Sequence, residues 1–216
     1  MLWIGTLDGG LNRLDRGAGT LTVYRHDPED ATSLSSNMVS AILRDRAGAL
    51  WVGTGDGWLE RFDPQTETFV HRRRLSESKL SAIAEDRAGN LWIGSGGEGL
   101  YRLDAERLTV EHFAHYWRDA DHWWREGTLS SHMVSALHVD RSGQLWAGTI
   151  YGGVNLRAEG ADRFGHLRHE PGDPNSLSHD QVLSILEEPA QDVVWIGTGR
   201  GLNRFDPASG TLSRYT

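Results

Sequence analysis

The sequence predicts an all-β protein of the β-propeller class, made of four complete four-stranded blades and one partial blade. The main observation is a five-residue phrase, with Trp second and Gly fourth, that occurs five times. Its tryptophans, which we expect to pack between blades, are Trp3, Trp51, Trp92, Trp146 and Trp195. Successive tryptophans are 48, 41, 54 and 49 residues apart, close to the period of about 40–50 residues that is typical of propeller blades.

The second unit shows how one blade is built from four short strands. Its apolar first segment is typical of a strand buried on both faces, and Asp and Gly in its turns favour tight reversals. A proline ends the third segment, since proline cannot donate to a ladder hydrogen bond. The expected strands are 39–43, 50–54, 58–62 and 68–71, separated by turns at 45–48, 55–57 and 63–64. Four antiparallel strands joined in this way make one blade.

The same plan arranges residues 1–216 as a single propeller array. The expected blades cover residues 1–26, 34–73, 75–115, 129–169 and 177–216. The first is partial, because Met1 stands where a second strand begins. We therefore expect an open arc or part of a larger ring, with a closed five-blade ring as the alternative. An open arc leaves apolar blade faces exposed, which favours self-association.

A repeated aspartate opens the first turn of three units. These residues, Asp45, Asp86 and Asp140, are interpreted as turn formers, because an aspartate can bond its own backbone and the glycine three residues later can take positive φ. The fifth unit departs from this pattern. Its turn, Glu188–Asp192, is one residue longer and lacks glycine.

Charge and composition argue against several classes of function. The 216 residues carry a net charge of −8 and no cysteine, which argues against a nucleic-acid-binding surface and excludes disulfides and thiolate zinc sites. The one basic run, 72–74, is interpreted as a solvated strand end. No apolar segment is long enough for a membrane span, and the N-terminus lacks the pattern of a signal peptide. Since Met1 lies inside a repeat, we expect a piece of a longer protein.

These repeats resemble the two-component regulator propeller family, whose pattern is V-x-S-I, then D-x-x-G, then L-W-x-G-T, then G-L-x-R-[FY]-D. Residues 39–63 fit it closely, apart from a shift at Trp58-Leu59, and residues 81–104 and 134–149 also fit. The resemblance implies the sensor part of a bacterial signalling protein, with two seven-bladed rings outside the membrane. It further implies, as partners, the remaining blades and a downstream histidine kinase or diguanylate cyclase. A periplasmic or extracytoplasmic location follows from the same resemblance.

Length variation is concentrated in the loops that lead from one blade to the next, and variable loops on a fixed scaffold often carry binding sites. The longest insertion, 114–127, combines aromatic rings with Asp, His and Arg. Rings can stack on sugar faces while carboxylates and imidazoles bond hydroxyls, so we predict a small polar ligand or glycan here. The alternative is that the tryptophans cap a blade edge or touch a neighbouring domain. The predicted ligand-binding residues are Tyr116, Trp117, Asp119, Asp121, His122, Trp123 and Trp124, with Tyr151 and Arg200 as weaker candidates.

Signals for catalysis, metal or cofactor were tested and none is convincing. Residues 94–99 match G-x-G-x-x-G, but a strand follows where a dinucleotide site needs a helix. The pairs His112/His115 and His166/His169 are three apart, a spacing that sends strand side chains to opposite faces. We therefore predict no cofactor, no metal and no catalytic residue, and interpret the chain as a non-catalytic sensory or binding propeller. The alternatives are a propeller enzyme, a lyase or glycosidase with a channel active site, and a protein-interaction scaffold.

Overall fold

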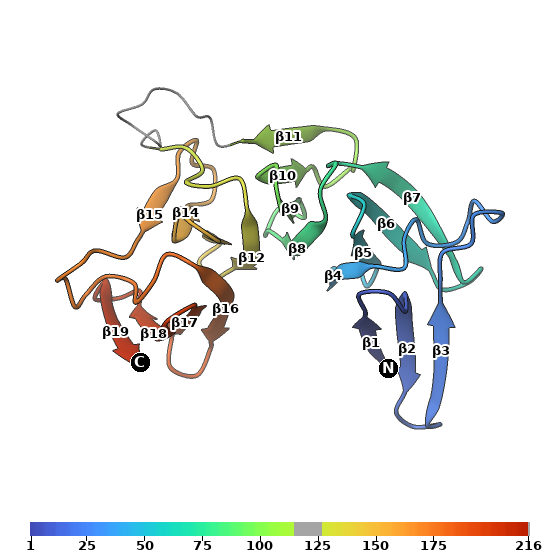
Figure 1. The fold of residues 1–216 in the computed structure, drawn as a ribbon, viewed down its shortest axis with the longest axis horizontal. Coiled ribbons are helices and arrows are strands. Elements are labelled where there is room, and N and C mark those ends of the chain that lie inside the picture. The colour runs from blue at the N-terminus through green and yellow to red at the C-terminus, as the bar shows by residue number, and fades with distance from the viewer. Residues whose placement is uncertain (115–126, 216) are drawn as a thin grey trace. The chain divides into compact units, whose positions relative to one another are not determined.

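The computed structural model describes residues 1–114 and 127–215 (Figure 1). The described residues form β-strands, turns and bends, with no helix among them. Accordingly, we find no helix in this part of the chain that is long and apolar enough to cross a membrane. The predicted ligand residues Tyr116, Trp117, Asp119, Asp121, His122, Trp123 and Trp124 lie outside the described residues.

The chain divides into two compact units, and the first is Met1–Ile83. Its first sheet, blade 1, has three antiparallel strands, β1 (Leu2–Gly5), β2 (Leu11–Asp15) and β3 (Thr20–Tyr24). Its second sheet, blade 2, has four: β4 (Val39–Arg44), β5 (Leu50–Thr54), β6 (Trp58–Asp63) and β7 (Thr68–Arg74). In both sheets the strands lie side by side in sequence order.

The second unit is Ala84–Thr216. Blade 3 is formed by β8 (Leu80–Glu85), which straddles the division, β9 (Leu91–Ser95), β10 (Leu100–Leu103) and β11 (Val110–Phe113). Blade 4 comprises β12 (Val134–Val139), β13 (Leu145–Thr149), β14 (Val154–Arg157) and β15 (Gly165–Leu167). Blade 5 comprises β16 (Val182–Glu188), β17 (Val193–Thr198), β18 (Gly201–Asp206) and β19 (Thr211–Tyr215).

The predicted fold class is confirmed: four four-stranded antiparallel sheets and one three-stranded sheet follow one another along the chain (Figure 1). Three strands of blade 2 run past their expected ends: β4 and β6 by one residue each, and β7 by three, since it continues to Arg74 instead of ending at residue 71. Each sheet has two ends. We call the end with the inter-blade loops and the β5–β6 type of turn the loop face, and the other end the turn face.

The glycine of the repeated phrase is required because a neighbouring blade passes against it. A Cβ on Gly5 would lie 2.7 Å from Val39 Cγ1, and one on Gly148 would lie 2.5 Å from Val182 Cγ1. Real Cβ contacts do not become this short, so only glycine lets the first strand of the next blade approach. The seam between blades therefore begins at the fourth position of the phrase.

Aromatic packing continues the same seams. The Trp3 ring packs edge-on against Phe62 at 5.0 Å, and the Trp146 ring packs edge-on against Phe205 at 5.4 Å. Trp51, Trp92 and Trp146 are buried, whereas Trp3 and Trp195 are partly buried. In these two seams a ring from one blade meets a ring on the third strand of the next, a geometry that adds to the stabilisation from burial.

The turn aspartates bind the tryptophan indoles as well as the turns. In blade 4, Asp140 Oδ1 accepts the backbone N–H of Gln144 at 2.9 Å, and Asp140 Oδ2 accepts the Trp146 indole N–H at 2.7 Å. Asp45 and Asp86 accept the indoles of Trp51 and Trp92 in the same way, at 2.8 and 3.0 Å. One carboxylate thus closes the first turn and satisfies an N–H that burial would otherwise leave without a partner.

The irregular turn of blade 5 preserves this bond with a different residue. Glu188 Oε2 accepts the Trp195 indole N–H at 2.8 Å. Glutamate is one methylene longer than aspartate, and it replaces Asp where the turn itself is one residue longer. We call these four contacts the carboxylate–indole bonds.

Removal of one carboxylate tests their contribution to stability. We expect Asp140→Ala to lower the free energy of unfolding by about 2–3 kcal/mol, because it leaves the buried Trp146 N–H without a partner and opens the turn. Chemical denaturation followed by tryptophan fluorescence measures the change. Asp63→Ala is the control, since Asp63 accepts one exposed turn N–H, from Gln65, and should cost less than about 1 kcal/mol. Equal losses in the two variants would contradict the assignment.

Candidate functional site

The residue type at one inward-facing position of the third strand differs between blades. Equivalent residues at this position are found from the pairing of the second and third strands. The residue lies opposite the central residue of the repeated phrase, as Asn155 lies opposite Ala147 and Asn203 opposite Ile196. It is asparagine in three blades but Glu60 in blade 2 and Tyr101 in blade 3. The set at this position is Asn12, Glu60, Tyr101, Asn155 and Asn203.

The asparagine attaches the incoming inter-blade loop to its sheet. Asn155 Oδ1 accepts the backbone N–H of Ser130 at 2.7 Å, and its amide donates to Ala147 O at 3.1 Å. Asn203 makes the equivalent bonds with Ser178 N–H at 2.8 Å and Ile196 O at 3.0 Å. A neutral amide suits this site, because it supplies a donor and an acceptor without burying a charge.

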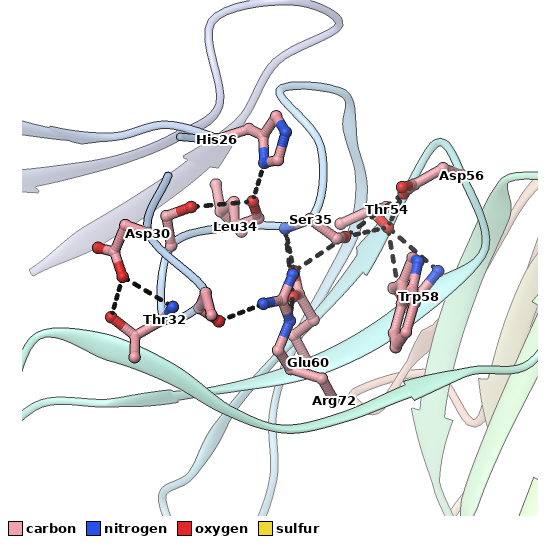
Figure 2. Close-up of polar contacts among 12 residues, drawn as sticks. His26, Asp30, Thr32, Leu34, Ser35, Thr54, Asp56, Trp58, Glu60 and Arg72 are labelled. Atoms are coloured by element: carbon pink, nitrogen blue, oxygen red, sulfur yellow. Dashed lines mark hydrogen bonds and ion pairs between the residues drawn. The ribbon is translucent and has the colours of Figure 1, made fainter. Parts of the chain in front are cut away.

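Blade 2 places a carboxylate in this buried position. The Ser35 N–H lies 3.2 Å from both Glu60 oxygens, which reproduces the loop contact of the asparagines (Figure 2). Arg72 adds an ion pair, with its Nε 2.6 Å from Glu60 Oε1. The Glu60 side chain is fully buried while that of Arg72 is partly exposed. The interpretation of Arg72 as a solvated strand end is therefore wrong, because its guanidinium neutralises a buried charge.

A local irregularity of the strands produces this pair. The pairing of β6 with β7 shifts register between Leu59 and Arg61, so that Glu60 lies opposite a β-bulge in β7. Bulges commonly re-aim side chains beside functional sites.

Trp58 stands where other blades have a glycine that has no room for a side chain. A Cβ on Gly10, for example, would lie 2.1 Å from Tyr24 O. In blade 2 the positive φ moves to Gly57, at 86°, which leaves room for the indole.

A hydrogen-bonded network joins the pair to the loop face. Ser35 Oγ lies 3.1 Å from Thr54 Oγ1, which in turn donates to Asp56 Oδ1 at 2.6 Å (Figure 2). The Trp58 N–H donates back to Thr54 Oγ1 at 3.2 Å. The Arg72 guanidinium lies 5.7 Å from the centre of the Trp58 ring and also bonds Ala31 O. We call Ser35, Thr54, Asp56, Trp58, Glu60 and Arg72 the Glu60 cluster.

The cluster offers two kinds of surface to a ligand. Asp56, Trp58 and Arg72 are partly exposed, so a carboxylate, an aromatic ring and a guanidinium are accessible at the loop face. Behind them, burial raises the pKa of Glu60, against the opposing hydrogen bonds from Ser35 and the charge of Arg72. Carboxyl groups with a raised pKa and a specific charged partner are frequent at functional sites.

The adjoining inter-blade loop, residues 25–38, is held by its own contacts. His26 Nδ1 lies 2.6 Å from Leu34 O, and Asp30 Oδ1 accepts the Thr32 N–H at 2.8 Å (Figure 2). A cavity of about 510 Å³ lies beside this loop. The loop 169–178 repeats the arrangement, with His169 Nδ1 2.7 Å from Leu177 O. Because two blades share these contacts, we interpret them as structural.

The remaining predicted residues stand apart. Tyr151 is 62% exposed in the β13–β14 turn, and Arg200 is exposed in the β17–β18 turn. No hydrogen bond or ring contact joins the two within the described chain. His166 and His169 contact separate carbonyls, of Thr128 and Leu177, and residues 1–114 and 127–215 hold no group of three or more metal-ligating side chains.

Reading the sequence for conventional motifs missed the Glu60 cluster. The signal was present, since aligning the third strands places Glu60 where three other units carry Asn, and Trp58 where all four carry Gly. The partner, Arg72, is not visible in that alignment, because its position depends on the bulge.

The family comparison bears on this same segment. A family model described as "Two component regulator propeller" matches residues 33–56 and 74–97. These two segments carry two-component regulator propeller repeats. The first matched repeat contains Ser35, Thr54 and Asp56 of the Glu60 cluster.

Solved structures share the fold. The extracellular domain of a hybrid two-component system from B. thetaiotaomicron is 26% identical, with a TM-score of 0.56 over 94% of this chain and 31% of that chain. PorZ, a surface component of the type-IX secretion system of Porphyromonas gingivalis, is 18% identical, with a TM-score of 0.72 over 99% and 32%. Virginiamycin B lyase from Staphylococcus aureus is 13% identical, with a TM-score of 0.73 over 99% and 65%. The last two show likeness of fold alone.

This chain is thus a propeller region similar to the extracellular domains of two-component systems. It spans about a third of the length of the extracellular-domain structures that it matches. A search of curated proteins gave no match.

The buried carboxylate predicts a pH-dependent contribution to stability. A carboxyl group whose folded-state pKa is raised stabilises the fold fully below its ordinary value of about 4.5 and loses this contribution as pH rises through the folded pKa. We therefore expect the stability of the protein, relative to Glu60→Gln, to increase as pH falls from 7 towards 4.5. Denaturant unfolding of both proteins across this range measures the difference. A relative loss on acidification would show that the Arg72 charge outweighs burial.

Proposed function

We propose that this chain belongs to the ligand-binding sensory region of an extracytoplasmic receptor, and that it binds a polar ligand such as a glycan on its loop face without catalysis. The observation that carries the proposal is the Glu60 cluster, where blade 2 replaces a neutral structural residue by a buried carboxylate, which is paired with a partly exposed arginine beside an accessible ring. The two-component regulator propeller repeats support the receptor context. Periplasmic location and coupling to a downstream signalling domain are parts of this proposal.

The chemistry of the cluster suits a hydroxylated ligand. The Trp58 ring can stack on the apolar face of a sugar ring, and Asp56 can accept hydrogen bonds from hydroxyl groups. The cluster is also anchored, because Glu60, Ser35 and Thr54 fix the turn that carries both residues. A pre-organised site loses less conformational entropy when it binds.

Binding measurements on single variants test this site. With a panel of neutral and acidic oligosaccharides in titration calorimetry, we expect Trp58→Ala to weaken binding about tenfold, since loss of a stacked ring costs roughly 1–1.5 kcal/mol. Tyr215→Ala is the control, because Tyr215 is an exposed ring on β19, in the other compact unit from Trp58. The panel should be bound without turnover.

The insertion predicted from the sequence provides a second variant. If Trp123→Ala with Trp124→Ala weakens binding while Trp58→Ala does not, the ligand belongs to the insertion and not to the Glu60 cluster. Absence of binding by every oligosaccharide, or cleavage of any of them, would contradict the proposed function itself.

We also infer that further blades cover the apolar face of blade 1. Leu2 and Ile4 are 45% and 40% exposed, whereas their equivalents in blade 2, Leu50 and Val52, are buried. Burying two such side chains would stabilise an interface by a few kcal/mol. In the isolated chain the same face is available for self-association.

The exposed pair can be tested directly. We expect Leu2→Ser with Ile4→Ser to reduce concentration-dependent self-association in analytical ultracentrifugation, because it removes apolar area from an uncovered sheet face. Leu108→Ser is the control, since Leu108 is exposed in a turn. Unchanged association in the double variant would exclude this face as the contact.

A further inference from the structure

Blade 4 carries an arginine at a seam position where blades 2 and 5 have an aromatic ring and blades 1 and 3 have leucine. Strand register equates Arg157, opposite Leu145, with Phe62 in blade 2 and Phe205 in blade 5. Those phenylalanines cover the tryptophan of a neighbouring blade, at 5.0 and 5.4 Å. Arg157 takes the same place, with its guanidinium 5.0 Å from the centre of the Trp92 ring.

The arginine is surrounded by rings but lacks a hydrogen-bond acceptor. Its guanidinium also lies 5.2 Å from Phe113 and 5.9 Å from Phe164. Its Nε is buried without a partner, and Arg157 donates no hydrogen bond to any residue in the described part of the chain. Aromatic faces stabilise the charge, yet they leave the planar set of donors unsatisfied, which is costly when partly buried. Burial accordingly lowers the pKa of Arg157, and the nearby Arg102 adds to this effect.

The next residue removes a negative charge at the same point. In the other blades an aspartate follows the seam residue and accepts turn N–H groups, as Asp63 and Asp206 do for Gln65 and Ala208. Blade 4 has Ala158 instead. At these two positions together, blade 4 is therefore more positive by two charges than blades 2 and 5.

A cavity of about 310 Å³ opens at this corner, on the turn face of the second unit. Its inner polar groups are already engaged: Asp86 accepts the Trp92 indole and the Asn90 amide, and Arg102 pairs with Glu111 at 3.2 Å. The polar and charged residues that line it are Asp86, Asn90, Arg102, Arg157, Glu159 and Asp162. Arg157 is thus the one cation of the described lining with no hydrogen-bonded partner.

The rim has the opposite charge. Glu159 and Asp162 line the cavity and are exposed. With Asp86, the lining has three carboxylates against two arginines, a net charge of −1. A multiply charged anion would therefore be repelled. A ligand with one carboxylate and one neighbouring ammonium group matches both the guanidinium and the rim.

We propose that the Arg157 cavity is a binding site for a small zwitterionic amino carboxylate, such as a free α-amino acid. The carboxylate of the ligand pairs with the Arg157 guanidinium in a bidentate manner, and its ammonium group faces Glu159 and Asp162. A cavity of this size accommodates a small ligand. The site is on the turn face, so it is separate from the loop-face site and does not depend on the function proposed for that site.

Titrations monitored by the indole NMR signal of Trp92 test the assignment. The probes are L-alanine, L-lactate, propionate and inorganic phosphate, applied to the whole chain. We expect L-alanine to bind best and phosphate worst, with weaker binding of alanine at high salt because the contact is ionic. Stronger binding of phosphate, lactate or propionate than of alanine would overturn the proposal, as would no binding of alanine.

Two variants separate binding from folding. Arg157→Gln should weaken alanine binding at least tenfold, as expected for loss of a charge-assisted hydrogen bond. Arg157→Phe introduces the phenylalanine that blades 2 and 5 carry at this position, so it should abolish binding without lowering the melting temperature. Arg13→Gln is the matched control, because Arg13 lies over Trp3 at 5.8 Å in the other unit. Unchanged binding in either Arg157 variant would overturn the proposal.

Discussion

The structure depends on one contact, the hydrogen bond from an indole N–H on the second strand of a blade to a carboxylate at the end of the first. This bond connects the local structure of one turn with the packing between two blades. The carboxylate closes the turn between the two strands, and the indole that it orients fills the seam with a neighbouring blade. Without a partner, the buried N–H would oppose the packing that places it there. Blade 5 shows how strongly the contact is specified, because a longer turn is matched by the longer Glu188.

A scaffold fixed in this way can tolerate changes elsewhere, and both candidate sites lie where a repeat position is altered. Glu60 replaces an asparagine that attaches the loop to its sheet, and it keeps that contact while adding a charge that Arg72 neutralises. Arg157 takes the seam position that is phenylalanine in blades 2 and 5, and it contacts a tryptophan ring as they do. In each case the structural role is preserved and a new polar group is added. We regard this combination as the mark of a functional change within a repeat array.

Much of the fold could be predicted from the sequence, because the repeated phrase marks strand, turn and seam together. Spacing of the tryptophans and glycine turns defines the sheets and places most strand ends. The extension of β7 to Arg74 could not be predicted, because it depends on the bulge opposite Glu60. The role of the turn aspartates was recognised only in part, since their bond to the indole needs the three-dimensional placement of residues six apart in the chain. The site residues predicted within 116–124 stay predictions.

The most direct test of the central contact is hydrogen exchange of the individual indole N–H groups, measured by NMR. Trp195 and Trp3 form a matched pair, because both are partly buried, but only Trp195 has a carboxylate partner within the described chain. We expect slow exchange for Trp51, Trp92, Trp146 and Trp195, and fast exchange for Trp3. Equal exchange rates for Trp195 and Trp3 would show that burial alone protects the indoles, which would contradict the account.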